Sequence, residues 1–310
     1  MKRGIVLGVL VGIAALSMVV AAFQGPPPRP PSQQALQATK IEKVKNNLYV
    51  ITGSDSTDFN ATSGGNTAVF IAEKGVVLVD TKLPGWGQPI LDRIRTVTNK
   101  PVTMIINTHT HGDHTGSNEF FGATVDIVAQ ENTKANMEKM DAFKGDNAKY
   151  LPKETFKDKM SLMGGKDRID LYYFGAGHTN GDAWVVFPAV RVMHAGDMFA
   201  AKNQPLIDTM SGGSIVAFAQ TLTKAGAIKD VDTIITGHST LMTPKDLREY
   251  AEFNKDFLAW AQAQLTAGKS VDQAAAEYKI PDKYEGYTIF QPFGGIKLNV
   301  QAAYNELKKQ

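Results

Sequence analysis

The stretch Asn107–His114 constrains the fold more than any other part of this sequence. It reads Asn-Thr-His-Thr-His-Gly-Asp-His, and it directly follows the apolar run Val102–Ile106. An apolar, β-branched run that ends in a polar turn predicts a buried strand that delivers the polar side chains to the edge of a sheet. Imidazole is the commonest metal ligand among side chains, so three histidines and an aspartate crowded together favour a metal site.

The spacing inside this stretch divides its ligands into two pairs. Alternate residues of an extended chain point the same way, so we expect His109 and His111 to bind one ion together. Asp113 and His114 follow Gly112, where the chain can turn and face a second ion. The competing interpretation is a histidine-rich surface turn with weak metal affinity, because a short motif alone produces false positives.

The same pattern recurs three more times: an apolar run ends at a glycine, and a histidine or an aspartate follows. These positions are the pairs Gly177-His178, Gly196-Asp197 and Gly237-His238. Ligands at strand ends, with rigid strands behind them, form a preorganised site. We therefore expect these residues to complete the site begun by 107–114.

Two further polar residues lie at or near the ends of predicted strands. Asp80 follows the apolar run Gly75–Val79, and it is either a turn cap or a hydrogen-bond partner of a histidine ligand. His194 lies inside a predicted strand, so we expect it to pack in the core or to support a ligand from behind rather than to bind metal.

Composition narrows the chemistry of such a site. The chain has 310 residues, 43% of them apolar, which is enough for one large α/β domain with additions. It has no cysteine, so any metal is held by nitrogen and oxygen atoms. Lys and Arg number 33 against 31 Asp and Glu, which leaves no basic excess for nucleic acid. We therefore expect a small-molecule substrate.

The N-terminus is typical of an export signal. Lys2 and Arg3 precede an uncharged stretch, and Val20-Ala21-Ala22 fits a small-residue cleavage site. We predict a signal peptide over 1–22, whose removal takes the net charge from +2 to 0 (2 − 2), and export to the periplasm or the outside with no stable membrane partner. The alternative is an uncleaved anchor helix, because the apolar stretch is long enough to span a bilayer.

The rest of the chain divides into three parts. A Pro-rich flexible linker is predicted over 23–40. The main domain is expected over 41–268, where strands alternate with helices and predict a layered α/β fold. Within it, we expect one strand over 41–52, and 53–65 is either a lid or an ordinary connection. Residues 269–310 are expected to form a helical and aromatic extension that packs on the domain.

Together the motifs resemble those of the metallo-β-lactamase superfamily, over about Ile41–Leu265. The matching motifs, in the family's order, are His109-x-His111-x-Asp113-His114, Gly177-His178-Thr179, Gly196-Asp197 and Gly237-His238. The resemblance implies that 41–268 is the catalytic domain of a metal-dependent hydrolase. It also implies a four-layer αββα sandwich, with two mixed sheets and helices on both outer faces, which agrees with the α/β (α+β) class predicted from the alternation.

Carried over residue by residue, the resemblance implies two zinc ions per chain, with iron or manganese as alternatives. The ligands of the first ion would be His109, His111 and His178. Those of the second would be Asp113, His114 and His238, with Asp197 as the bridge. A hydroxide shared by the ions would attack the substrate, and Asp113 would act in catalysis by orienting the nucleophile or moving its proton.

Asp197 bears on the choice of substrate. The best-known β-lactamases of the superfamily carry a cysteine at this place, and another subclass carries a serine. Aspartate is more similar to the thioester hydrolases and lactonases, so we expect cleavage of an ester, lactone, thioester or β-lactam amide bond. One alternative is a dedicated secreted β-lactamase. Another is an iron-dependent redox enzyme or sulfur dioxygenase, although diiron members place glutamate where this chain has His111, which favours zinc.

Two residues are predicted to contact the substrate. Phe59 is the aromatic side chain of the 53–65 loop, and Lys202 follows Asp197 closely enough to attract a carboxylate. The competing interpretation of Lys202 is a solvated surface lysine.

Overall fold

The computed structural model describes residues 30–53, 61–291 and 294–309. The predicted signal peptide, 1–22, lies outside them, and so does Phe59 with most of its loop. Within the described ranges, no helix combines the length and the apolar character that crossing a membrane requires.

The first sheet has seven strands that lie side by side in sequence order. Neighbours from β1 to β4 pair antiparallel, and neighbours from β4 to β7 pair parallel. The parallel pairing of β4 with β5 brings Asp80 and the 107–114 stretch to the same sheet edge. The strands are β1 (Ile41–Lys45), β2 (Leu48–Ile51), β3 (Thr67–Ile71), β4 (Val76–Val79), β5 (Val102–Ile106), β6 (Asp126–Gln130) and β7 (Glu154–Phe156).

The second sheet has five strands in the order β12-β11-β10-β9-β8. Its neighbours pair antiparallel except β11 and β12, which run parallel. Parallel strands end at the same edge, so Asp197 and His238 follow neighbouring strand ends. The strands are β8 (Lys159–Leu162), β9 (Ile169–Tyr172), β10 (Trp184–Phe187), β11 (Val192–His194) and β12 (Thr233–Ile235).

Side-chain alternation explains why the two sheets stack. In β4, Val77 and Val79 pack in the core between the sheets, together with Val185 of β10. Their neighbours Val76 and Leu78 belong to a different core on the outer side of the first sheet. A strand that is apolar on both faces is buried on both sides, as the apolar run Val76–Val79 requires.

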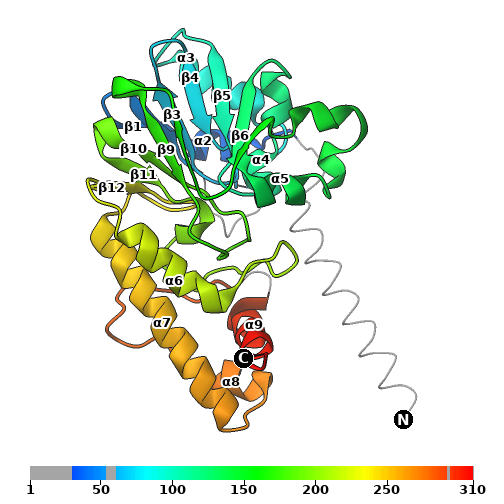
Figure 1. Cartoon of the computed structure of the whole chain (residues 1–310), viewed down its shortest axis with the longest axis vertical. Helices are drawn as coiled ribbons and strands as arrows, with labels where there is room; N and C mark the ends of the chain where they lie inside the picture. The colour runs from blue at the N-terminus through cyan, green and yellow to red at the C-terminus, as the bar shows by residue number, and fades with distance from the viewer. Residues whose placement is uncertain (1–29, 54–60, 292–293, 310) are drawn as a thin grey trace.

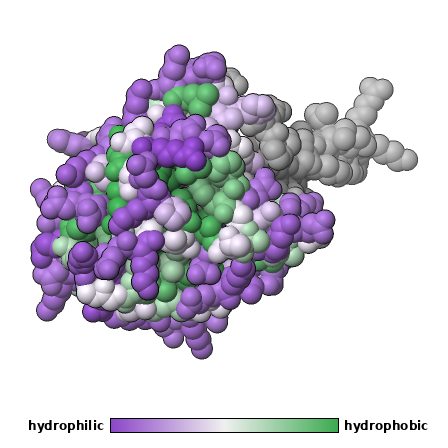
Figure 2. Space-filling view, turned by 90° about the horizontal axis from the view of Figure 1, so that it is seen from above, coloured by the Kyte–Doolittle hydropathy of each residue, from purple (hydrophilic) through white to green (hydrophobic). Residues whose placement is uncertain are grey.

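Helices cover both outer faces of the sandwich. On the first sheet, α3 (Gly87–Arg95) buries Ile90 and Ile94. On the second sheet, α6 (Ile215–Gly226) and α7 (Pro244–Thr266) lie side by side (Figure 1). The molecule is thus the predicted four-layer αββα sandwich. Seen from above, hydrophilic side chains surround a central area of apolar ones (Figure 2).

The C-terminal extension packs at the end of α7. It contains α8 (Val271–Glu277) and α9 (Gly295–Leu307), which lie at the foot of the molecule (Figure 1). Tyr278 and Tyr304 of the extension share a buried cluster with Phe257 of α7. The extension therefore belongs to the same folded body as the sandwich.

The structure differs from expectation in two places near the N-terminus. Residues 41–52 form a hairpin of β1 and β2 rather than one strand, because Asn47 takes a left-handed φ of 60° at the turn. Part of the predicted flexible linker is a helix, α2 (Gln33–Ala38), which Ser32 caps and whose Ala35 is buried. The side-chain cap and the buried contact hold this segment in one conformation, although its composition alone predicts a mobile linker.

Candidate metal centre

The predicted metal ligands lie at one edge of the sandwich, in loops that follow strand ends. His109 and His111 follow β5, and the short helix α4 (Gly112–Thr115) turns Asp113 and His114 toward them. The second sheet supplies His178 between β9 and β10, Asp197 after β11 and His238 after β12. The site therefore forms where the two stacked sheets end side by side.

Two glycines allow the ligands to approach this closely. A Cβ atom at Gly237 would lie 2.0 Å from Asp197 Oδ1. A Cβ atom at Gly65 would lie 2.2 Å from Cε1 of the His114 ring. Neither position tolerates a side chain unless a ligand moves, so both glycines are part of the site.

The ligand atoms form two groups, and within each group they lie within 4.8 Å of one another. The first group is His109, His111, His178 and Asp197. The second group is Asp113, His114 and His238. The resemblance implies His109, His111 and His178 for one ion and Asp113, His114 and His238 for the other, and each of these sets falls within one group.

Asp197 lies between the two groups. Its Oδ2 is 3.7 Å from Nε2 of His178 in the first group and 3.3 Å from Nε2 of His238 in the second. Its Oδ1 is 3.3 Å from Nε2 of His114. One carboxylate thus faces ligands of both groups.

Hydrogen bonds on the outer side of the rings decide which nitrogen points inward as an acceptor. His111 Nε2 donates to Oδ2 of Asp208 over 3.0 Å, and His178 Nδ1 donates to the Leu206 carbonyl over 2.6 Å. Carboxylate and carbonyl oxygens only accept, so His111 Nδ1 and His178 Nε2 are left with lone pairs. These two nitrogens lie 2.9 Å apart.

Asp80 orients two more ligands, so the predicted contact with a histidine is present. Its Oδ2 accepts from His114 Nδ1 over 2.8 Å and from Thr108 Oγ1 over 2.7 Å. The Thr108 oxygen in turn accepts from His109 Nδ1 over 2.9 Å. Asp80 has a left-handed φ of 65°, a strained conformation for a residue with a side chain, and these hydrogen bonds hold it there.

The residues present fit divalent cations. Two imidazole lone pairs at 2.9 Å repel each other unless a positive charge lies close to both. His109 Nε2 is buried with no hydrogen-bond partner among the described residues, which costs about 1–3 kcal/mol unless something binds it. Nitrogen and oxygen donors without thiolate suit zinc, and also iron or manganese.

The two groups differ in charge. Burial, together with neighbouring imidazoles, lowers the pKa of His109 and of His178 below the usual range, so both are neutral and ready to bind a cation. Burial also opposes the charge on His238, but Asp197 and Asp113 outweigh it and raise the pKa to about 9. Metal binding at the second group is therefore coupled to proton release.

Asp113 is the most exposed of the seven predicted ligands. The side chain of Asp113 is 31% exposed, whereas those of His109 and His114 are 1% and 0% exposed. His238, which contacts Asp113, is 14% exposed. A small molecule would therefore approach from the Asp113 side.

The other predicted site residues lie around this centre or away from it. His194 is buried, donates from Nε2 to the Asn66 carbonyl and accepts from the Gly196 N–H, so it supports the loop that carries Asp197. Lys202 is paired with Asp246 and Glu249 of α7 at 2.8 and 3.2 Å. The ion pairs support the surface interpretation of Lys202, and its contact with substrate stays a prediction.

Sequence reasoning missed two buried charged residues next to the centre. Asp208 is fully buried against His111, but it follows no strand end and carries no local signal. Lys82 is also fully buried, and its Nζ donates to the carbonyls of Gly65 and Thr52 over 2.7 and 3.1 Å. Lys82 thereby ties together both ends of the 53–65 loop. Burial, with the charge of Arg93, lowers its pKa to about 7.

Because the pKa of Lys82 is lowered, we predict that the stability of the metal-free protein depends on pH. Between pH 7 and 10 the folded state releases a proton that the unfolded state still binds, so stability rises with pH. Relative to a Lys82→Met variant, the wild type should gain up to about 1.4 kcal/mol of unfolding free energy per pH unit. Urea unfolding at several pH values measures this. The same change at the exposed Lys100, which also donates to two backbone carbonyls, should leave the wild-type slope intact.

The fold and the two ligand groups define a metal-binding protein of the αββα class. The profile described as "Metallo-beta-lactamase superfamily" matches residues 61–238. This match covers more than half of the chain and every ligand identified above, so the chain belongs to the metallo-beta-lactamase superfamily.

Curated proteins and solved structures agree with this membership. The chain is 34% identical over 169 residues to "Metallo-beta-lactamase type 2" of Elizabethkingia meningoseptica, across 53% of this chain and 63% of that protein. It is 26% identical over 204 residues to "Metallo-beta-lactamase IND-1" of Chryseobacterium indologenes, across 63% of this chain and 80% of that protein. Both relatives carry the name of the family whose profile matches, and the chain spans less than two thirds of the length of the first of them.

Two solved structures share the fold. A metallo-beta-lactamase from Pontibacter korlensis superposes with a TM-score of 0.59 at 20% identity, over 70% of this chain and 99% of that one. The DIM-1 metallo-beta-lactamase superposes with a TM-score of 0.55 at 22% identity, over 69% of this chain and 97% of that one.

Proposed function

We propose that this protein is a dinuclear zinc hydrolase that cleaves an ester, lactone, thioester or β-lactam amide bond of a small molecule. The observation that carries the proposal is the position of Asp197, whose carboxylate faces both ligand groups at 3.3 to 3.7 Å. A shared carboxylate between two groups of nitrogen and oxygen ligands supports two ions close enough to act on one substrate.

Each ligand has a defined part in this proposal. His109, His111 and His178 hold one ion, and Asp113, His114 and His238 hold the other, with Asp197 between them. Bound zinc supplies a Lewis acid for the substrate oxygen and lowers the pKa of a water molecule to about 7. Asp113 is the partly exposed carboxylate, so it can accept a proton from the attacking water and pass it to the leaving group.

Two observations bear on the substrate. The relatives are named metallo-beta-lactamases, which supports a β-lactam as one substrate. Asp197 stands where the resemblance implies cysteine or serine in dedicated β-lactamases, which supports an ester, lactone or thioester instead. The near balance of 33 basic and 31 acidic residues supports a small molecule rather than nucleic acid.

Export is part of the same proposal. The basic start, the apolar stretch and the Ala21-Ala22 site support cleavage after Ala22. N-terminal sequencing of the protein recovered from the periplasm of an expressing bacterium should therefore begin at Phe23. Recovery of the full chain in the membrane fraction would instead support the uncleaved anchor.

A panel of hydrolysis substrates tests the proposed activity. The protein, loaded with zinc and checked by elemental analysis, is offered a cephalosporin, an acyl lactone, a thioester and an aryl ester. We expect about two zinc ions per colourless chain and hydrolysis of at least one substrate. Chelation should abolish the activity reversibly, because the core between the sheets holds the fold without metal.

His111→Ala is the control variant for this panel, since His111 serves only the first ligand group. Its activity should be nearly lost while its circular dichroism spectrum is retained. Full activity in a metal-verified His111→Ala protein would contradict the proposal. Tightly bound iron with turnover that depends on O₂ would replace it with the redox alternative.

A further inference from the structure

The loop over 202–214 carries the outer contacts of the first ligand group. It joins β11 and its following turn to α6, and within it Asp208 and Leu206 accept the hydrogen bonds of His111 and His178. The backbone N–H of Asp208 also donates to the His178 carbonyl over 2.8 Å. A shift of this loop would therefore turn two of the three histidines that serve the first ion.

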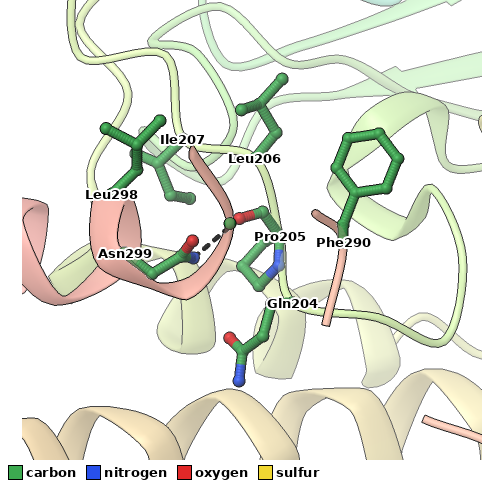
Figure 3. A pocket seen from close by; sticks show the side chains of 8 residues that line it. Gln204, Pro205, Leu206, Ile207, Phe290, Leu298 and Asn299 are labelled. Atoms are coloured by element: carbon green, nitrogen blue, oxygen red, sulfur yellow. Dashed lines mark hydrogen bonds between the residues drawn. The ribbon is translucent and has the colours of Figure 1, made fainter. Parts of the chain in front are cut away.

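The C-terminal extension holds this loop from the opposite side. Asn299 of α9 donates from Nδ2 to the Pro205 carbonyl over 2.7 Å, one residue before Leu206 (Figure 3). Gln204 donates to the hydroxyl of Tyr278 over 2.6 Å. Both partners are nearly buried, Asn299 at 6% and Tyr278 at 7% exposure, so water cannot readily replace either bond.

The extension also holds the far end of the loop. Glu306 of α9 accepts from the backbone N–H of Ile215, where α6 begins, over 2.9 Å. The N–H of the preceding residue, Ser214, donates to the Gly177 carbonyl over 2.9 Å. Gly177 directly precedes His178, so this second path from the extension also ends at the first ligand group.

The second ligand group has different supports. His114 is oriented by Asp80 of the first sheet. His238 is placed by its backbone N–H, which donates to the Ala200 carbonyl before the 202–214 loop. Among the described residues, no hydrogen bond joins the extension to His114 or to His238.

We propose that the C-terminal extension is a positioning element for the first ion, acting through the 202–214 loop on His111 and His178. Asn299 is its main positioning residue, because its amide holds the carbonyl next to the one that orients His178. The inference rests on the proposed metal centre, but not on hydrolysis or on any substrate. It gives 269–310 a role beyond covering the end of α7.

Zinc affinity, measured one ligand group at a time, tests this role. A His238→Ala background leaves the first group intact, and a His178→Ala background leaves the second. Competition with a chromogenic chelator then gives the affinity of each group with and without Asn299→Ala. Loss of an outer partner of a ligand costs about 10- to 100-fold in metal affinity. Asn299 lies one step further out, so we expect about a 10-fold loss in the first group and none in the second.

Matched variants keep the test specific. Asp208→Asn alters a residue that contacts His111 directly. It should therefore also weaken zinc binding in the first group alone, and by a larger factor. Asn305→Ala changes an exposed asparagine of the same helix, whose side chain only accepts from Gln301, and should change neither affinity. Tyr278→Phe removes one hydroxyl and keeps the ring. If Asn299→Ala folds poorly, the zinc affinity of Tyr278→Phe tests the same support of the loop by the extension.

Two results would overturn the inference: an unchanged first-group affinity in both Asn299→Ala and Tyr278→Phe, or an equal loss in both groups. The second result would mean that the extension only stabilises the whole fold. A protein that binds two zinc ions but hydrolyses nothing would contradict the proposed function and leave this test valid. Unmeasurable zinc binding in the wild type would overturn the metal centre and this inference with it.

Discussion

Replacing Asp197 with alanine should reduce hydrolysis by about 1,000-fold or more, equivalent to about 4 kcal/mol of transition-state stabilisation. The reason is its position, because the same carboxylate lies 3.3 Å from His114 and from His238 and 3.7 Å from His178. Without it, neither group keeps its full set of donors. The buried imidazoles also lose the negative charge that offsets a cation beside them.

Steady-state kinetics on the best substrate of the panel, with zinc content measured on the same sample, checks this prediction. The metal-free variant should keep the wild-type circular dichroism spectrum, because Asp197 lies outside the core between the sheets. Asp256→Ala is the control, since this carboxylate of α7 bonds Tyr284 and Lys283 and contacts none of the metal ligands among the described residues. Wild-type turnover in the Asp197 variant would contradict the proposed centre.

Replacing Asp80 with asparagine should have the second largest effect, and it should affect both ligand groups. Asp80 accepts three hydrogen bonds, two from Thr108 and one from His114. An asparagine of the same shape presents an NH₂ group to at least one of these donors. We expect about 10- to 100-fold weaker zinc binding and a loss of about 3 kcal/mol in unfolding free energy.

The two-background affinity measurement separates this effect from that of Asp208. Asp80→Asn should weaken zinc binding in both backgrounds, because Asp80 orients His114 directly and His109 through Thr108. Asp208→Asn should weaken only the first group. If Asp80→Asn left both affinities at the wild-type value, the orienting role assigned to this carboxylate would be wrong.

Much of the centre could be predicted because its ligands repeat one local pattern. His109, His111, His178 and His238 each follow an apolar run, and such runs end at a sheet edge whatever the rest of the chain does. The place of Asp80 next to the site could be predicted for the same reason, because Asp80 also follows an apolar run. The alternation of strands and helices predicted a layered α/β fold, the family resemblance implied the αββα sandwich, and the structure confirms both.

The supporting residues could not be predicted because their partners are distant in sequence. Asp208 meets His111 across 97 residues, and Asn299 meets Pro205 across 94. The sequence suggests a surface position for Lys82, since nothing near it indicates that the carbonyls of Thr52 and Gly65 will meet its side chain. Each of these contacts depends on how two loops pack, and local periodicity carries no information about that.

The stretch 107–114 shows which properties of the site follow from the sequence and which follow from the tertiary structure. By itself the sequence determined that these residues are delivered by a strand end and that they split into two pairs of ligands, because backbone geometry sets both. Only the tertiary structure decided which ring nitrogen of each histidine faces inward, because that depends on the partner behind the ring. It also decided that Asp197 lies between the groups, because the stacking of two separate sheets brings β5 and β11 to the same edge.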